Sequence, residues 1–206
     1  MEENNGALID TRLSVTKFII ITNIIIFLFM LVTGEPSNGE YMAEHGALWT
    51  PYVIENGEYY RLFTAIFLHF DASHIFNNLL LLFFLGDILE RSLGKVMYTI
   101  VYILCGLAGN ILSMSVEILT SDYSVSAGAS GAIFGVVGGV LFEVVYHKGR
   151  YRGISTGRIL FFVLLSLYVG MSSSGVNNSA HVGGLVSGFV LTAIVQIISD
   201  FRSKKA

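Results

Sequence analysis

Long apolar runs are the feature that most restricts how this chain of 206 residues can fold. Hydrophobic residues make up 53% of the sequence and charged residues only 13%, roughly half the charged share of a soluble domain. A helix needs about 20 mostly apolar residues to cross a bilayer. Six segments reach or approach that length: 17–33, 75–90, 96–119, 130–146, 157–171 and 181–201. The sequence therefore predicts an all-α membrane protein, with a six-transmembrane-helix domain over 17–201 and short tails over 1–16 and 202–206.

The distribution of lysine and arginine predicts the orientation of these helices. With six spans, one side holds both termini and the loops near 91–95 and 147–158, and it carries all of the Lys and Arg residues except one. The exception, Arg61, falls in the long first loop over 34–73. We therefore expect a multi-pass protein with both termini cytoplasmic. The short tails, with no appended soluble domain, suggest that it belongs to the cell (plasma) membrane. The N-terminus lacks the basic start and small-residue cleavage site of a secretory signal, so the first apolar run is expected to be retained.

Four polar residues are expected at one depth of the membrane. The second, fourth and sixth spans run from outside to inside, so their first residues lie at the same outer level. His74 and Asn78 open the second span, Ser130 opens the fourth and His181 opens the sixth. Polar groups inside a membrane are costly and usually mark a functional site.

Ser130 lies in GASGAIFG (128–135), at a junction between a loop and a helix. The flanking glycines allow the backbone to approach a substrate closely. The unpaired N–H groups of a helix start stabilise a developing oxyanion, assisted by the positive end of the helix dipole. A glycine-rich helix start also fits simple small-residue packing, so this motif is not specific by itself.

His181 lies in NSAHVGGLVSG (178–188), where two glycines have the spacing that lets helices touch backbone to backbone. These glycines are Gly184 and Gly188, and Gly131 and Gly135 form a matching pair in the fourth span. A single membrane histidine more often bridges helices by a hydrogen bond. If the two glycine pairs pack together, however, the histidine and the serine come within reach, as a general base and its nucleophile require.

His74 and Asn78 are spaced four residues apart, so both point from one face of a helix. As neutral donors they suit an oxyanion hole better than a metal site, because the third ligand and the carboxylate of a zinc hydrolase are absent. We expect no metal and no cofactor. No basic patch suited to nucleic acid is present, and the single cysteine, Cys105, is expected to be a buried hydrophobic residue.

No carboxylate is well placed to complete a catalytic triad. Glu143 lies about 20 Å along the helix from Ser130. Asp87 and Glu90 lie similarly deep in the second span, and Glu117 has no sequence relation to the histidine. A Ser–His dyad is the simpler hypothesis.

The chain resembles the rhomboid family over about residues 17–200. Four segments carry the resemblance: RLFTAIFLHFDASHIFNN (61–78), LGDILE (85–90), GASGAIFG (128–135) and NSAHVGGLVSG (178–188). Each is weak alone, but their order and their placement on these helices make the combination specific. The resemblance implies a six-helix rhomboid-like bundle with a partly membrane-embedded first loop, in which Arg61 and Glu90 are structural anchors.

The resemblance also implies an activity, that of an intramembrane serine endopeptidase. Such enzymes cleave single-span membrane proteins near the outer membrane surface, often after a small residue. Ser130 would be the nucleophile and His181 the base, while His74, Asn78 and the Ser130 N–H would form the oxyanion hole. The residues expected to support this site are Gly128, Gly131, Phe134 and Asn178. Phe134 stands where some relatives have a tyrosine stacked on the histidine, so an aromatic face is retained.

Two other functions are compatible with the sequence: a catalytically inactive rhomboid-like protein that binds membrane proteins, or a small transporter. The presence of both Ser130 and His181 argues against the first. A transporter would spread its polar groups across the membrane depth, whereas here they gather at one level. The polar segment 172–178 is expected to cap the site, and the short span 157–171 suits a lateral gate.

Overall fold

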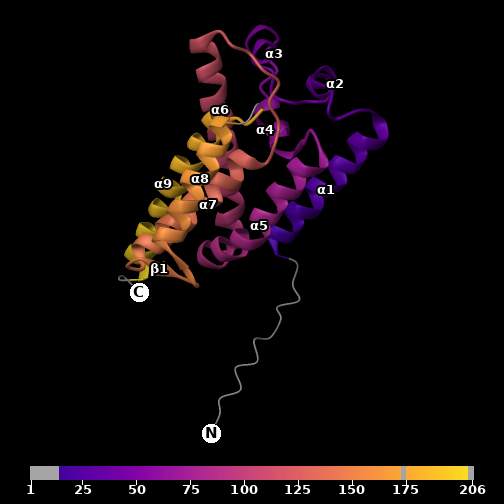
Figure 1. Ribbon diagram of the computed structural model, residues 1–206. Helices are drawn as coiled ribbons and strands as arrows, with labels where there is room; N and C mark the ends of the chain where they lie inside the picture. The colour runs from indigo at the N-terminus through magenta and orange to yellow at the C-terminus, as the bar shows by residue number, and fades with distance from the viewer. Residues whose placement is uncertain (1–13, 173–174, 204–206) are drawn as a thin grey trace.

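A bundle of long helices forms the body of the protein in the computed structural model, which describes residues 14–172 and 175–203 (Figure 1). The long helices are α1 (Val15–Thr33), α5 (Ala72–Leu93), α6 (Lys95–Thr120), α7 (Ser130–Tyr146), α8 (Thr156–Ser172) and α9 (Asn178–Ser203). They match the six predicted segments, with ends that agree within three residues. The first loop contains four short helices: α2 (Gly39–Glu44), α3 (Thr50–Glu55), α4 (Arg61–Thr64) and the 3-10 helix η1 (Ala65–Phe67).

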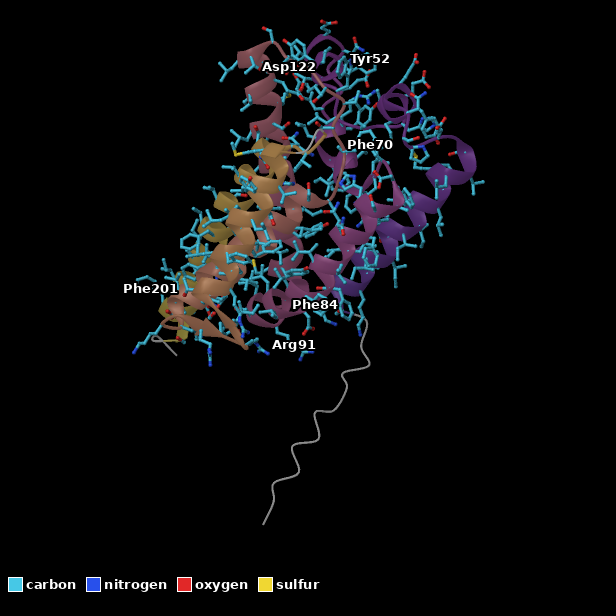
Figure 2. All side chains as sticks on the ribbon, viewed as in Figure 1. Tyr52, Phe70, Phe84, Arg91, Asp122 and Phe201 are labelled. Carbon is cyan, nitrogen blue, oxygen red and sulfur yellow. The ribbon has the colours of Figure 1, made fainter. Side chains whose placement is uncertain are left out.

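Four of the long helices, α1, α5, α6 and α9, are long and apolar enough to cross a membrane within the described part of the chain. Helices α7 and α8 are also apolar but have 17 residues each. The prediction of a helical integral membrane protein is confirmed. Each end of the bundle also holds segments that the sequence analysis assigned to the same side. Figure 2 shows Tyr52 and Asp122 at one end, and Arg91 and Phe201 at the other.

Helix α7 is the centre of the bundle. It is apolar on all sides, and nearly all of its residues from Gly131 to Val144 are buried. A helix of this kind has no face suited to water, so other helices must cover it. Helices α5, α6 and α9 pack around it, and its valines join Leu82, Leu89 and Tyr102 in the main hydrophobic core.

The first loop folds around one buried arginine. The guanidinium of Arg61 is only 3% exposed and donates hydrogen bonds to the backbone oxygens of Ala43 and Ala47. It also forms an ion pair with Glu58 at 2.5 Å. These bonds hold the ends of short helices that have little core of their own. The expected role of Arg61 as a structural anchor is confirmed.

A small β-hairpin between α7 and α8 corrects the expectation that all regular structure is helical. Strands β1 (Arg150–Tyr151) and β2 (Ile154–Ser155) pair antiparallel, with Tyr151 opposite Ile154. The turn between them has two residues, Arg152 and Gly153, both with positive φ. Such a short strand pair has no detectable alternation in the sequence, because its register is fixed by the turn rather than by a hydrophobic pattern.

Glu90 fastens the start of α1 to α5. Its carboxylate, only 5% exposed, accepts hydrogen bonds from the backbone N–H groups of Val15 and Thr16 and from the Thr16 hydroxyl, at 2.8–2.9 Å. The first N–H groups of a helix have no partner within the helix, so a carboxylate at this point supplies one. Glu90 is therefore the second anchor, as expected.

We predict that Glu90→Ala destabilises the fold by about 3 kcal/mol, because it leaves buried N–H groups without an acceptor. Thermal unfolding in one detergent measures this loss. The matched control is Asp87→Ala on the same helix, which removes an exposed ion pair with Arg91 and should cost at most about 0.5 kcal/mol. Equal losses in the two variants would contradict the role given to Glu90.

Candidate active site

Ser130 is the first residue of α7 and is half-buried. The preceding residue, Ala129, offers no side chain to cap the helix. The N–H groups at the start of α7 therefore have no side-chain acceptor, and they face the same region as the serine. An uncapped helix start of this kind attracts negative charge.

His181 lies in the first turn of α9, which packs against α7 through glycine. A Cβ added at Gly184 would collide with the backbone oxygen of Gly131, and one added at Gly188 would collide with that of Gly135. The predicted pairing of the two glycine faces is confirmed. A Cβ on Gly131, next to Ser130, would lie 3.5 Å from the oxygen of Ala180, which precedes His181. The serine and the histidine thus occupy adjoining helix starts.

The imidazole of His181 lies over the first turn of α7. Its ring stacks on Phe134, with centroids 4.1 Å apart and planes inclined by 5°. Phe134 is one helical turn after Ser130, so the stack holds the imidazole beside the serine. In the described residues, no hydrogen bond joins Ser130 to His181, and the Nδ1 atom of the histidine has no partner.

His74 and Asn78 lie on α5 and face the segment that leads into Ser130. A Cβ built on Gly128 would lie 2.8 Å from the Nε2 atom of His74 and 3.8 Å from the Nδ2 atom of Asn78. Asn78 is only 8% exposed, and its Nδ2 donor has no partner among the described residues. A buried amide donor without an acceptor is unfavourable unless a ligand supplies one. Both side chains are therefore placed to bind an oxygen beside the serine.

The first loop holds the segment before Ser130 from the other side. Leu48 and Ser126 exchange two backbone hydrogen bonds of 2.8 Å, and the Gly128 N–H donates to the Ala65 oxygen at 2.9 Å. Gly128 has a φ of 142°, a conformation that side chains rarely adopt. The backbone position of the site is thus set by the first loop together with α5.

Glu117 supports the same segment from α6. Its carboxylate accepts hydrogen bonds from the Thr50 hydroxyl and, at 3.0 Å, from the Ser124 hydroxyl. Thr50 belongs to the first loop and Ser124 to the segment before α7. Glu117 does not contact His181, so its role is to join these two segments.

Asn177 is a site-supporting residue that the sequence analysis missed. Its Oδ1 atom caps α9 by accepting the Ala180 N–H at 3.0 Å, and its Nδ2 atom donates to the hydroxyls of Ser113 and Ser126. It therefore ties the start of α9 to α6 and to the segment before α7. An asparagine directly before an apolar helix is a common cap, and this signal was available in the sequence.

Asn178, which was expected to support the site, joins α9 to α8. Its Nδ2 atom donates to the Leu167 oxygen at 3.1 Å. Part of the segment 172–178, expected to cap the site, lies outside the described residues. The gating role expected for α8 also stays a prediction from the sequence.

His69 is a second residue that the sequence analysis missed, and it packs against His74 of the site. Its ring is fully buried, and its centroid lies 5.0 Å from that of His74 in an edge-on contact. Burial, with a smaller effect from His74, lowers the pKa of His69 to about 3. His69 is therefore neutral at physiological pH and adds no positive charge beside His74.

Residues 14–172 and 175–203 contain no group of three or more His, Cys, Asp or Glu side chains that could hold an ion. Cys105 is buried, as expected, against the glycine face of α7. The chemistry available at the site is that of a hydroxyl, an imidazole and several neutral N–H donors.

These features describe a helical membrane protein with a hydroxyl and an imidazole at adjoining helix starts, and comparison with known proteins identifies its family. Residues 56–197 match the family model described as a Rhomboid domain, and the chain belongs to the rhomboid family.

Several known proteins are similar to this chain. Rhomboid protease GluP of Bacillus subtilis is 33% identical over 178 residues, which cover 86% of this chain and 34% of GluP. YdcA of the same bacterium is 37% identical over 139 residues, 68% of each protein. RHOMBOID-like protein 1 of Arabidopsis thaliana is 36% identical over 150 residues, 71% of this chain and 37% of that protein. The chain thus spans only about a third of the length of GluP.

Proposed function

We propose that this protein is an intramembrane serine endopeptidase in which Ser130 and His181 form a catalytic dyad. The observation that carries the proposal is the arrangement of the helix starts. The glycine contact between α7 and α9 puts the serine and the histidine on adjoining first turns, and two donors of α5 face the same point. Membership of the rhomboid family, and the name of the relative GluP, support the same reaction.

In this mechanism the Ser130 Oγ attacks the carbonyl carbon of a substrate peptide bond while His181 accepts the hydroxyl proton. The carbonyl oxygen becomes a negatively charged oxyanion. When the C–N bond breaks, His181 returns the proton to the leaving amine, and an acyl-enzyme remains. Water then attacks the ester by the same steps in reverse, which releases the acid product and restores the serine.

The oxyanion would be bound by three neutral donors: the Ser130 N–H, the His74 ring and the Asn78 amide. All three would be in position before substrate binds, so their dipoles would not need to reorganise during the reaction. The unpartnered Nδ2 atom of Asn78 supports this role, because the oxyanion would satisfy it. No carboxylate contacts the His181 ring in the described residues, which favours a dyad over a triad.

The proposed substrates are single-span membrane proteins, cut near the outer surface of the membrane. Helix α7 has 17 residues and is about 25 Å long, less than the roughly 30 Å hydrocarbon core. Ser130 would therefore lie somewhat below the membrane surface, within reach of a substrate helix that has begun to unwind.

We further propose that all six long helices cross the cell membrane and that both termini are cytoplasmic. The support is the distribution of lysine and arginine along the sequence, which falls almost entirely in the segments predicted to be cytoplasmic. Figure 2 shows one of these residues, Arg91, at the end of the bundle opposite Tyr52. The site would then open toward the external side, where water is available.

Ser130→Ala and His181→Ala should each reduce cleavage of a model single-span substrate to background, because neither member of a catalytic pair is effective alone. The assay uses the purified chain in proteoliposomes, with unfolding temperature as the check on folding. Matched controls are Ser115→Ala on α6 and His45→Ala in the first loop, which should cleave normally. Substantial cleavage by the folded Ser130→Ala variant would rule out the assignment.

Asn78→Ala should lower kcat by about 10²-fold while KM changes little, because the amide contacts the oxygen most strongly when it is charged. The neighbouring, exposed Asn77→Ala serves as the control. A merely structural Asn78 would give the opposite pattern: a lower unfolding temperature and an unchanged kcat per folded molecule.

A further inference from the structure

The β-hairpin at the end of the bundle opposite the site carries an unusual concentration of positive charge. The segment 147–158, HKGRYRGISTGR, contains four Lys and Arg residues and no acidic residue. These residues are Lys148, Arg150, Arg152 and Arg158, and all four are exposed. Within 14–172 and 175–203, none of them forms an ion pair with a carboxylate.

The acids of the neighbouring helices are engaged elsewhere. Glu143 of α7 is buried and accepts hydrogen bonds from Ser92 and Gln196, with His147 3.4 Å from its second oxygen. Asp200 of α9 accepts a hydrogen bond from the Tyr146 hydroxyl. Neither acid forms an ion pair with a hairpin cation in the described residues.

The backbone of the hairpin holds these cations in place. Tyr151 and Ile154 pack inward on the main core, and the Tyr151 ring stacks on His147 with centroids 4.4 Å apart. The Thr156 N–H, at the start of α8, donates to the Gly149 oxygen at 3.1 Å. The cations thus project from a fixed platform rather than from a loose loop.

Arg152 occupies a backbone conformation that arginine does not favour. Its φ is 44°, and Gly153 follows with a φ of 83°, as in the two-residue turns in which Asn, Asp or Gly is preferred at the first position. Lys148 is in a similar conformation, with a φ of 58°. Asn would fit the backbone of this turn better than arginine. The Arg152 side chain contacts its neighbour Tyr151, with its Nε atom 3.2 Å from the phenol oxygen, but it pairs with no carboxylate in the described residues. Its positive charge is therefore available to a ligand.

The hairpin is also next to the membrane interface, because it joins the ends of two apolar helices. The exposed Tyr146 lies at the end of α7 just before it, and such aromatic residues are typical of the headgroup level. Clusters of lysine and arginine at this level bind the phosphate groups of anionic lipids.

We propose that the hairpin cluster, defined as Lys148, Arg150, Arg152 and Arg158, binds the headgroup of an anionic phospholipid in the adjacent leaflet. The lipid phosphate would accept hydrogen bonds from the arginines and hold the near end of α8, which starts at Thr156. This inference requires only that the protein is in a membrane, and it does not depend on the proposed proteolytic activity.

The test measures the unfolding temperature of the full chain in a neutral detergent during titration with phosphatidylglycerol. Phosphatidylcholine with the same acyl chains tests the need for negative charge, and glycerol phosphate tests whether a free phosphate suffices. We expect only phosphatidylglycerol to raise the unfolding temperature. An equal increase with glycerol phosphate would show a phosphate site rather than a lipid site and would overturn the proposal.

Two double variants remove equal charge from the same end of the bundle. Arg150→Gln with Arg152→Asn should weaken the apparent affinity for phosphatidylglycerol about 25-fold, or roughly fivefold per cation. Lys17→Gln with Arg202→Gln should leave it nearly unchanged. Equal effects of the two variants, or no effect of the first, would contradict a specific site.

The single variant Arg152→Asn separates a loss of lipid binding from a loss of folding. Because Asn accepts positive φ readily, this variant should unfold at the same or a higher temperature without anionic lipid, yet bind the lipid about fivefold more weakly. If its lipid affinity matches that of the unmodified protein, Arg152 does not bind the headgroup.

Discussion

The contact between the backbones of α7 and α9 is the interaction on which the rest of the site depends. Gly131 and Gly135 of α7 meet Gly184 and Gly188 of α9 so closely that no side chain fits between them. In a membrane the hydrophobic effect does not drive helices together, and close van der Waals packing between small residues takes its place. Because the contact begins at the first turn of both helices, it also fixes the distance between Ser130 and His181.

The remaining contacts of the site orient Ser130 and His181, the two residues that α7 and α9 bring together. The stack of His181 on Phe134 sets the plane of the imidazole, and the cap supplied by Asn177 fixes the start of α9. The backbone bonds from Leu48 and Ala65 set the path of the segment that precedes the serine. Each of these partners comes from a different part of the chain, so the site exists only when the whole outer end of the bundle is assembled.

The long helices and the principal polar residues were predictable because their signals are local. Apolar runs of spanning length gave the helix bounds within three residues, and the glycine spacing indicated which faces of α7 and α9 pack together. The placement of His74 and Asn78 on one face of α5 follows from helical periodicity alone.

The parts that were not predicted depend on contacts between distant residues. The buried Arg61 of α4 binds the backbone at the end of α2 and just after it, and the hairpin depends on a turn that holds Arg152 at positive φ. The role of Glu117 arises from Thr50 and Ser124, which are far apart in sequence from one another. No periodic pattern in the sequence indicates such pairings, because each depends on a few polar contacts between particular residues.

The central claim is that the α7–α9 contact brings Ser130 and His181 together as a reactive pair, and one measurement tests it directly. A fluorophosphonate reacts with an activated serine, and mass spectrometry identifies the labelled residue and the rate. In the unmodified chain and in Gly157→Ala, whose added methyl meets nothing within 4 Å, we expect rapid labelling of Ser130. Gly188→Ala changes no reacting group but forces the two helices apart, so labelling should slow by about 10²-fold in the folded protein. Labelling of Gly188→Ala at the unmodified rate, or of a residue other than Ser130, would contradict the claim.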